Sequence, residues 1–166
     1  MIDDSVIVIV GPTAAGKTAV AVEVAERLGG EIISVDSRQI YRYMNIGTAK
    51  PAAADLRRVA HHFIDIRNPD QGYSAGNFGR EARGCIRDLQ HRGVVPILAG
   101  GSGLYVQAVL DGFFIDATDY SAVRMELIDQ LELNGLEAML EELRMLDPRA
   151  VERLEPADTQ RILRAL

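Results

Sequence analysis

The sequence contains a single cysteine, Cys85, and this scarcity excludes an internal disulfide framework. One thiol is in keeping with a reducing compartment such as the cytoplasm. Long apolar runs are lacking as well, because none approaches the ~20 residues that a membrane-spanning helix needs. Residues 1–4 show no basic segment of signal-peptide type. We therefore expect a cytoplasmic protein without a membrane partner.

Lysine is also scarce, since Lys17 and Lys50 are the only lysines among the 18 basic residues. The others are arginines, whose flat guanidinium groups recognise phosphates and planar groups better than lysine does. The formal net charge is nevertheless −6, and the acidic excess lies in residues 116–166. This balance excludes a general nucleic-acid binder but leaves room for RNA on a local, arginine-lined surface.

Clusters of cysteine, histidine and carboxylate with metal-ligand spacing are missing from the sequence. His61 and His62 are adjacent, so they would point in different directions on a helix or a strand. We therefore interpret both histidines as structural. No histidine or aspartate stands near Ser102 in the sequence, and this argues against a hydrolase nucleophile.

The most informative feature that is present is the phosphate-binding pattern G-x-x-x-x-G-K-[ST] at residues 11–18, which read GPTAAGKT. An apolar run at 6–10, of the type expected for a buried strand, precedes it and a helical pattern at 19–28 follows it. This context distinguishes a binding loop from a plain glycine-rich turn. Lys17 adds a positive charge, and Thr18 offers its hydroxyl to Mg²⁺. The residues expected to bind a diphosphate or nucleotide are Gly11, Pro12, Thr13, Ala14, Ala15, Gly16, Lys17 and Thr18.

Beyond this loop, apolar strand patterns alternate with helical ones. We predict strands at 31–35, 63–66 and 94–99, helices at 52–61, 74–92 and 104–110, and a long functional loop at 37–51. This alternation predicts an α/β fold, a parallel sheet flanked by helices like that of P-loop NTPases. Cys85 lies in the apolar stripe of the 74–92 helix, so we interpret it as a packed core thiol.

The remainder of the sequence differs in character. From about residue 113 glycine thins out, charge rises, and leucine and methionine recur with helical spacing, interrupted at Asn134-Gly135 and Asp147-Pro148. We predict an α/β core at 1–112 and an α-helical insertion subdomain at 113–166. Because only three core strands are convincing and residues 159–166 break off within a helical pattern, we expect a fragment of a longer protein.

Three loops follow the carboxyl ends of predicted strands, at 11–18, 36–39 and 100–103, where open α/β sheets bind their ligands. Asp36 could hold Mg²⁺ directly or through water, act as a general base, or merely cap a turn. Ser37, Arg38 and Gln39 offer a hydroxyl, a guanidinium and an amide suited to a base edge or a phosphate. We expect the three loops to converge on one site.

Taken in order, these motifs resemble those of the tRNA dimethylallyltransferases, also called tRNA isopentenyltransferases. The matching segments are GPTAAGKT (11–18), DSRQIY (36–41), IGTAKP (46–51), HHFID (61–65), PILAGGSGLY (96–105) and DTQRILRAL (158–166). The resemblance covers the chain from end to end, although family members are roughly twice as long.

The resemblance implies transfer of a dimethylallyl group from dimethylallyl diphosphate to N6 of the adenosine 3′ of a tRNA anticodon. It implies catalytic roles for Lys17, Thr18, Asp36 and Ser102, with Asp36 as general base and Mg²⁺ at Thr18 and, through water, at Asp36. It further implies a tRNA-facing second domain. The residues implied to contact tRNA are Asp36, Ser37, Arg38, Gln39, Ser102, Arg124, Gln160, Arg161, Ile162, Leu163 and Arg164.

Other functions remain open at this point. An adenylate isopentenyltransferase would use free adenine nucleotides, a P-loop kinase would use ATP, and an inactive fragment would bind phosphate or RNA without turnover. Binding of ATP in preference to the allylic diphosphate would favour the kinase. We expect a monomer whose partners are dimethylallyl diphosphate and the tRNA anticodon stem-loop.

Overall fold

The computed structural model describes residues 5–112 and 120–166. The chain divides into two compact units, Met1–Ile115 and Asp116–Leu166. The predicted domain boundary, between residues 112 and 113, adjoins the segment 113–119, which lies outside the described residues, as do residues 1–4. None of the helices in the described parts combines the length and apolar character that crossing a membrane requires.

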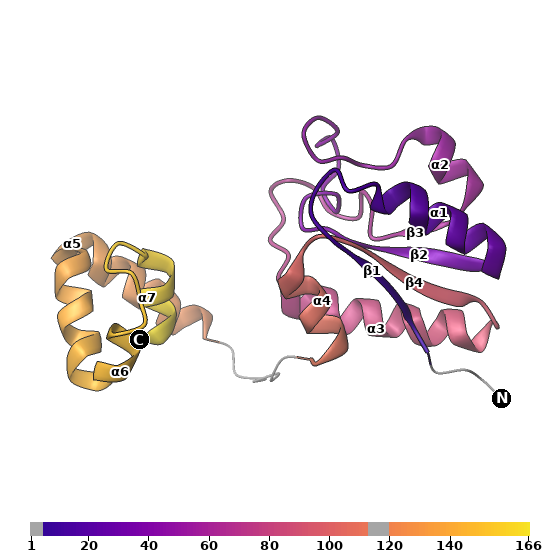
Figure 1. Ribbon diagram of the computed structural model, residues 1–166. Coiled ribbons are helices and arrows are strands. Elements are labelled where there is room, and N and C mark those ends of the chain that lie inside the picture. The colour runs from indigo at the N-terminus through magenta and orange to yellow at the C-terminus, as the bar shows by residue number, and fades with distance from the viewer. Residues whose placement is uncertain (1–4, 113–119) are drawn as a thin grey trace. The chain divides into compact units, whose positions relative to one another are not determined.

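The first unit is built around a four-stranded parallel sheet (Figure 1). Its strands are β1 (Ile7–Val10), β2 (Gly30–Val35), β3 (His61–His62) and β4 (Val95–Gly100), in the spatial order β1-β4-β2-β3. Because parallel strands need long crossovers, a helix stands in each connection: α1 (Lys17–Leu28), α2 (Ala53–Arg58) and α3 (Ala75–His91). The predicted α/β class, a parallel sheet flanked by helices, is confirmed.

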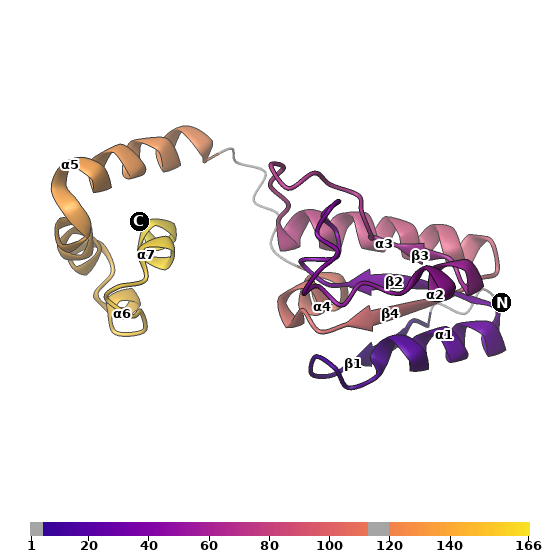
Figure 2. The same ribbon diagram turned by 90° about the horizontal axis from the view of Figure 1, so that it is seen from above.

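Helices cover both faces of this sheet (Figures 1 and 2). On one face, Ile32 and Ile97 pack against α1. On the other, Ile33 and Leu98 pack against α3 and α4 (Gly103–Leu110), around the fully buried Phe78. Neighbouring residues of one strand point to opposite faces, so each apolar run supplies both cores. Each fully buried side chain of this size contributes roughly 1.5–3 kcal/mol.

Helix α3 forms where the sequence predicts it. The Ser74 hydroxyl accepts a hydrogen bond from the Asn77 N–H at 3.1 Å and so caps the first turn. Cys85 packs against the core from the edge of the buried stripe, and burial raises the pKa of its thiol to about 11. It is therefore a protonated core thiol, as predicted. The buried residues of this stripe are Phe78, Gly79, Ala82, Ile86 and Leu89.

Two strand predictions are wrong in detail. The strand expected at 63–66 lies instead at His61–His62, because Phe63 and Asp65 have positive φ angles of 64° and 55° that no extended strand tolerates. The Phe63 ring packs edge-to-face on Phe78 at 5.1 Å, which explains its apolar character without a strand. The strand expected to be buried at 6–10 is the edge strand β1, and its Val10 is 57% exposed.

The second unit is helical and has a core of its own. It comprises α5 (Ser121–Leu146), α6 (Pro148–Val151) and α7 (Thr159–Ala165). Gly135, with φ 79° and ψ 167°, interrupts α5 at the predicted break. The Asp147 carboxylate accepts hydrogen bonds from two backbone N–H groups and starts α6 at the other predicted break. Met139, Leu143 and Ile162 form the buried centre.

Candidate active site

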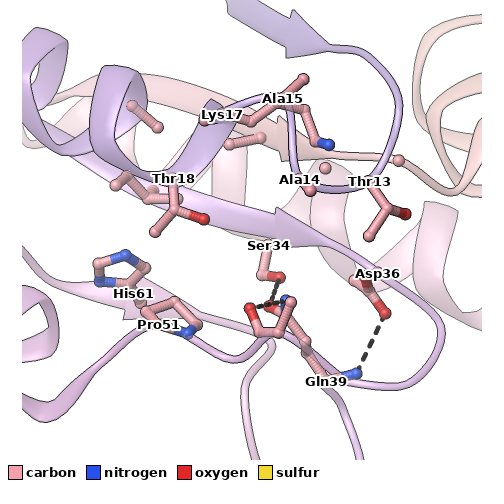
Figure 3. Close-up of a pocket in the computed structure, with 17 residues that line it drawn as sticks. Thr13, Ala14, Ala15, Lys17, Thr18, Ser34, Asp36, Gln39, Pro51 and His61 are labelled. Atoms are coloured by element: carbon pink, nitrogen blue, oxygen red, sulfur yellow. Dashed lines mark hydrogen bonds between the residues drawn. The ribbon is translucent and has the colours of Figure 1, made fainter. Parts of the chain in front are cut away.

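A pocket of about 300 Å³ opens at the carboxyl ends of β2 and β4 (Figure 3). Its walls come from the 11–18 loop, the start of α1, the 36–39 turn and the glycines after β4, so the three loops converge as predicted. Ala49 and Pro51 from the loop before α2 and His61 of β3 complete it. The lining residues are Thr13, Ala14, Ala15, Gly16, Lys17, Thr18, Ala21, Ile32, Ser34, Asp36, Gln39, Ala49, Pro51, His61, Ala99, Gly100 and Gly101.

The 11–18 loop is shaped to surround a ligand with backbone N–H groups. Ala14 and Gly16 have φ angles of 65° and 78°, a conformation that turns the chain sharply into α1. Helix α1 begins at Lys17 and no side chain caps it, so its first N–H groups are free to bind an anion. The Lys17 Nζ donates to the Pro12 carbonyl at 2.6 Å, which keeps its charge beside the loop. Gly11 and Pro12 flank this arrangement without lining the pocket.

Two glycines after β4 allow the loops to approach one another. A Cβ at Gly100 would lie 2.0 Å from the Val35 carbonyl oxygen, which no side chain tolerates. A Cβ at Gly101 would lie 3.5 Å from the Gly11 carbonyl oxygen and 3.9 Å from the Lys17 Nζ. Gly100 is thus required for the close packing of β4 against β2, whereas a Cβ at Gly101 would make only ordinary van der Waals contacts.

Asp36 combines two of the roles that the sequence left open. Its Oδ1 accepts hydrogen bonds from the Arg38 and Gln39 N–H groups at 2.8 and 3.2 Å and so caps the turn after β2. The same carboxylate lines the pocket, and among the described residues its Oδ2 has no hydrogen-bond partner. Capping one oxygen fixes the orientation of the other, which is left available to a ligand.

Gln39 anchors the loop that follows. Its Oε1 accepts from the Ser34 hydroxyl at 2.8 Å, and its Nε2 donates to the carbonyl oxygens of Thr48 and Ala49 at 3.2 and 2.9 Å. Both N–H donors of the amide are therefore used inside the protein. Arg38, next to it, is exposed.

Ser102 joins two of the converging loops. Its hydroxyl oxygen accepts from the Ser37 N–H at 3.1 Å, and its own N–H donates to the Val35 carbonyl at 3.2 Å. The neighbouring Gly101 lines the pocket, whereas Ser102 does not. The position of Ser102 thus ties the 36–39 turn to the end of β4.

His61 is the site residue that the sequence analysis missed, because it was assigned to a helix end and a structural role. It lies on β3 beside Ile32 and lines the pocket. Its Nδ1 is 2.9 Å from the Val59 carbonyl, so this nitrogen carries the proton. The buried Nε2 has no partner among the described residues, and burial lowers the pKa of the ring. His62 is structural as predicted, because its Nε2 donates to Glu31 at 2.7 Å.

The remaining predicted RNA-contacting residues belong to the second unit. Arg124, Gln160, Arg161 and Arg164 are exposed there. Ile162 is fully buried in the core of that unit, so only its backbone could reach a ligand. The half-buried Leu163 packs against the same core. Asp158 caps α7 by accepting the Arg161 N–H at 3.1 Å.

The pocket offers oxygen ligands of the kind that Mg²⁺ prefers. Within residues 5–112 and 120–166 no group of three or more histidine, cysteine or carboxylate side chains could hold a metal ion. Mg²⁺, however, commonly takes one or two protein oxygens and completes its shell with water and substrate phosphates. The Thr18 hydroxyl and the Asp36 carboxylate, which both line the pocket, fit that mode.

Comparison with known proteins agrees with this architecture. The family model described as IPP transferase matches residues 39–166. The tRNA dimethylallyltransferases of Desulfosudis oleivorans and Chlorobaculum parvum are 47% and 48% identical over 161 residues, and each alignment covers 97% of this chain and 51% of the relative. The chain thus spans about half the length of these curated relatives.

Solved structures give the same result. The full-length tRNA isopentenylpyrophosphate transferase from Bacillus halodurans is 41% identical, with a TM-score of 0.66 over 98% of this chain and 54% of that one. A eukaryotic dimethylallyltransferase, described as acting on tRNA, is 27% identical with a TM-score of 0.75, covering 96% of this chain and 40% of that one. By the match of its residues 39–166, the chain belongs to the IPP transferase family.

Proposed function

We propose that the protein to which this chain belongs transfers a dimethylallyl group from dimethylallyl diphosphate to N6 of the adenosine 3′ of a tRNA anticodon, releasing diphosphate. The observation that carries this proposal is one pocket lined by both a phosphate loop and a partly unpaired carboxylate, Asp36. Its relatives are named for this transfer. The presence of a single cysteine is in keeping with our further proposal that the protein acts in the cytoplasm.

The phosphate loop would bind the diphosphate of the donor. As the allylic C–O bond breaks, negative charge grows on the departing diphosphate, and donors already aimed at it lower the barrier. The first N–H groups of α1 and the Lys17 ammonium are placed to act in this way. We propose that Thr18, with Asp36 through water, holds Mg²⁺, which would supply further charge stabilisation at the diphosphate.

Asp36 would act on the acceptor. The adenosine N6 is a weak nucleophile because its lone pair is delocalised into the ring. As the new N6–C bond forms, N6 must lose a proton, and the Asp36 Oδ2 would accept it. The two backbone N–H groups on Oδ1 keep the carboxylate in one orientation for this step. Ser102 would support it by fixing the Ser37 end of the turn.

The acceptor base has to leave its stack before it can enter such a pocket. Unstacking costs little in an anticodon loop, where the bases are already single-stranded. We propose that Ser37, Arg38 and Gln39 at the pocket and Arg124, Gln160, Arg161, Ile162, Leu163 and Arg164 in the second unit contact the tRNA. Within the first group Gln39 would act by positioning the loop, because its amide donors are already engaged.

The substitution Asp36→Asn tests the proposal. Asparagine keeps an oxygen that can cap the turn but cannot accept the N6 proton. We expect dimethylallyl diphosphate to bind with unchanged affinity in calorimetry, and prenylation of an anticodon stem-loop RNA, followed by mass spectrometry, to fall by about 100-fold or more. Collapse of diphosphate binding would instead show that Asp36 acts chiefly by holding the metal or the turn, and would overturn its role as the base. Substitution of the exposed Asp70 by Asn serves as the control.

A further inference from the structure

The segment 37–50 differs in composition from the rest of the chain. It carries Arg38, Arg42 and Lys50 and two tyrosines but no acidic residue, in a chain with 24 acidic side chains. Gln39 and Ala49, near its two ends, both line the pocket. The segment therefore leaves the pocket rim and returns to it, and in Figure 1 it is part of the connection from β2 to α2.

This segment is held rigidly, although it contains no regular helix or strand. The Lys50 Nζ, whose side chain is only 9% exposed, donates to the Tyr41 carbonyl at 2.7 Å, to Asn45 Oδ1 at 3.1 Å and to Asp65 Oδ1 at 2.6 Å. The Arg42 N–H donates to the Arg67 carbonyl at 2.8 Å. Together with the Gln39 contacts, these bonds fix the loop in one shape.

Besides polar side chains, this loop presents one aromatic and one large apolar side chain to solvent. Tyr43 is 82% exposed and Ile46 is 97% exposed. Tyr43 also has a φ of 65°, a conformation that costs a non-glycine residue roughly 1 kcal/mol or more. The exposed ring adds little to the stability of the fold, and the positive φ makes tyrosine an unfavourable residue at this position.

The charge around Tyr43 and Ile46 suits a polyanion. Arg38 and Arg42 have no carboxylate within ion-pair distance among the described residues, and the Arg42 guanidinium instead contacts the Asp65 carbonyl and Asn68. Both positive charges are therefore uncompensated by direct ion pairs. A rigid loop that combines exposed aromatic surface with unpaired arginines is typical of single-stranded nucleic-acid binding, where bases stack on rings and phosphates meet cations.

We propose that Tyr43, with the exposed Ile46 of the same loop, forms a platform on which a nucleobase of the substrate RNA stacks, while Arg38 and Arg42 contact its phosphates. This rests on the proposed function, in which one base enters the pocket. The nucleotides next to that base must then cross the pocket rim, where residues 37–50 lie. Tyr43 is thus proposed as an RNA-binding residue distinct from the groups that hold the diphosphate.

The substitution Tyr43→Gly tests this platform, because glycine relieves the positive φ while removing the ring. We expect the free energy of unfolding to stay equal or rise, and the affinity for a fluorescently labelled anticodon stem-loop RNA to fall about 5- to 150-fold, as stacking of about 1–3 kcal/mol implies. Tyr43→Phe should retain the affinity. Leu28→Ala, at an exposed apolar residue ending α1, should leave it unchanged.

Unchanged RNA affinity of Tyr43→Gly would overturn the platform, as would failure of the unsubstituted chain to bind the RNA. Suppose that the unsubstituted chain sediments as a dimer and Tyr43→Gly as a monomer, with equal RNA affinity. Tyr43 and Ile46 would then contact a second copy of the chain, and the platform would also be overturned. Binding of dimethylallyl diphosphate, measured in parallel, should be the same in all variants. If the RNA result holds but this diphosphate does not bind, the RNA platform stands and the proposed transfer fails.

Discussion

In the first unit, the polar side chains at the amino end of the sheet are paired with one another, whereas those around the pocket at the carboxyl end are only partly paired. At the amino end of β2 and β4, Glu31 accepts hydrogen bonds from His62 at 2.7 Å and from Arg92 at 3.0 Å, and Arg92 also pairs with Asp88. In the pocket, which opens at the carboxyl end, Asp36 and His61 each retain an atom without a partner among the described residues. Charges are thus neutralised where the fold needs stability and left available where a ligand would bind.

The contacts that hold the backbone in place also differ between these two ends of the sheet. Ion pairs tie the amino end, whereas backbone hydrogen bonds, a close glycine contact and a buried amide, together with the Lys50–Asp65 ion pair, tie the loops at the carboxyl end. Backbone contacts fix loop shape without adding charge that would compete with a phosphate. Substitutions at the carboxyl end should therefore abolish binding, and those at the amino end should change stability alone.

The largest effect is expected for Gly100→Ala. The new Cβ would meet the Val35 carbonyl at 2.0 Å, so β4 must separate from β2 at the pocket floor. We expect a loss of about 3 kcal/mol or more in urea unfolding, together with loss of diphosphate binding. Gly103→Ala is the matched control, because nothing lies within 4 Å of a Cβ there. Equal stability of the two variants would refute the close approach of the strands.

A smaller, pH-dependent effect is expected at the other end for Glu31→Gln. Burial works against the charged form, yet hydrogen bonds from His62 and Arg92 hold the pKa of Glu31 below its ordinary 4.5. The carboxylate therefore stabilises the fold above about pH 4.5, and this contribution is lost as the pH falls through the lower folded-state pKa. We expect the variant to be about 1 kcal/mol less stable at pH 7.

Urea unfolding between pH 7 and about pH 3 would check this, since the two proteins should converge toward the acid end. Glu23→Gln, at an exposed ion pair with Arg27, should change stability little at any pH. If the difference in the free energy of unfolding between the Glu31 variant and the unsubstituted chain stays constant with pH, the charge of the carboxylate does not stabilise the fold. Diphosphate binding should be the same in both proteins at pH 7.

Local patterns made much of this architecture predictable. The phosphate loop, the α3 stripe and the break at Gly135 depend on residues close in sequence, and each lies where the pattern predicts it. What the sequence could not reveal depends on pairing between distant segments. Strand β3 is two residues long and has no periodicity to read, and the edge position of β1 follows from the strand order alone.

The site residues, too, fall into those that a local sequence pattern predicts and those whose place depends on contacts between distant segments. Asp36 follows an apolar strand, which made it a candidate, but its double role as cap and pocket wall depends on the geometry of one turn. No local sequence pattern predicted His61 as a pocket residue, because its place there is set by the pairing register Ile32↔His61. The exposure of Tyr43 arises from a loop shape fixed by Lys50 and Gln39, which no local pattern encodes.

The central claim is that the phosphate loop of this chain binds an allylic diphosphate. The most direct test is calorimetric titration of the chain with dimethylallyl diphosphate and, separately, with ATP, each in the presence of Mg²⁺. We expect the allylic diphosphate to bind in preference to ATP, and Lys17→Ala to abolish this binding while leaving the free energy of unfolding unchanged. Preference for ATP, or undiminished binding of the allylic diphosphate by Lys17→Ala, would contradict it.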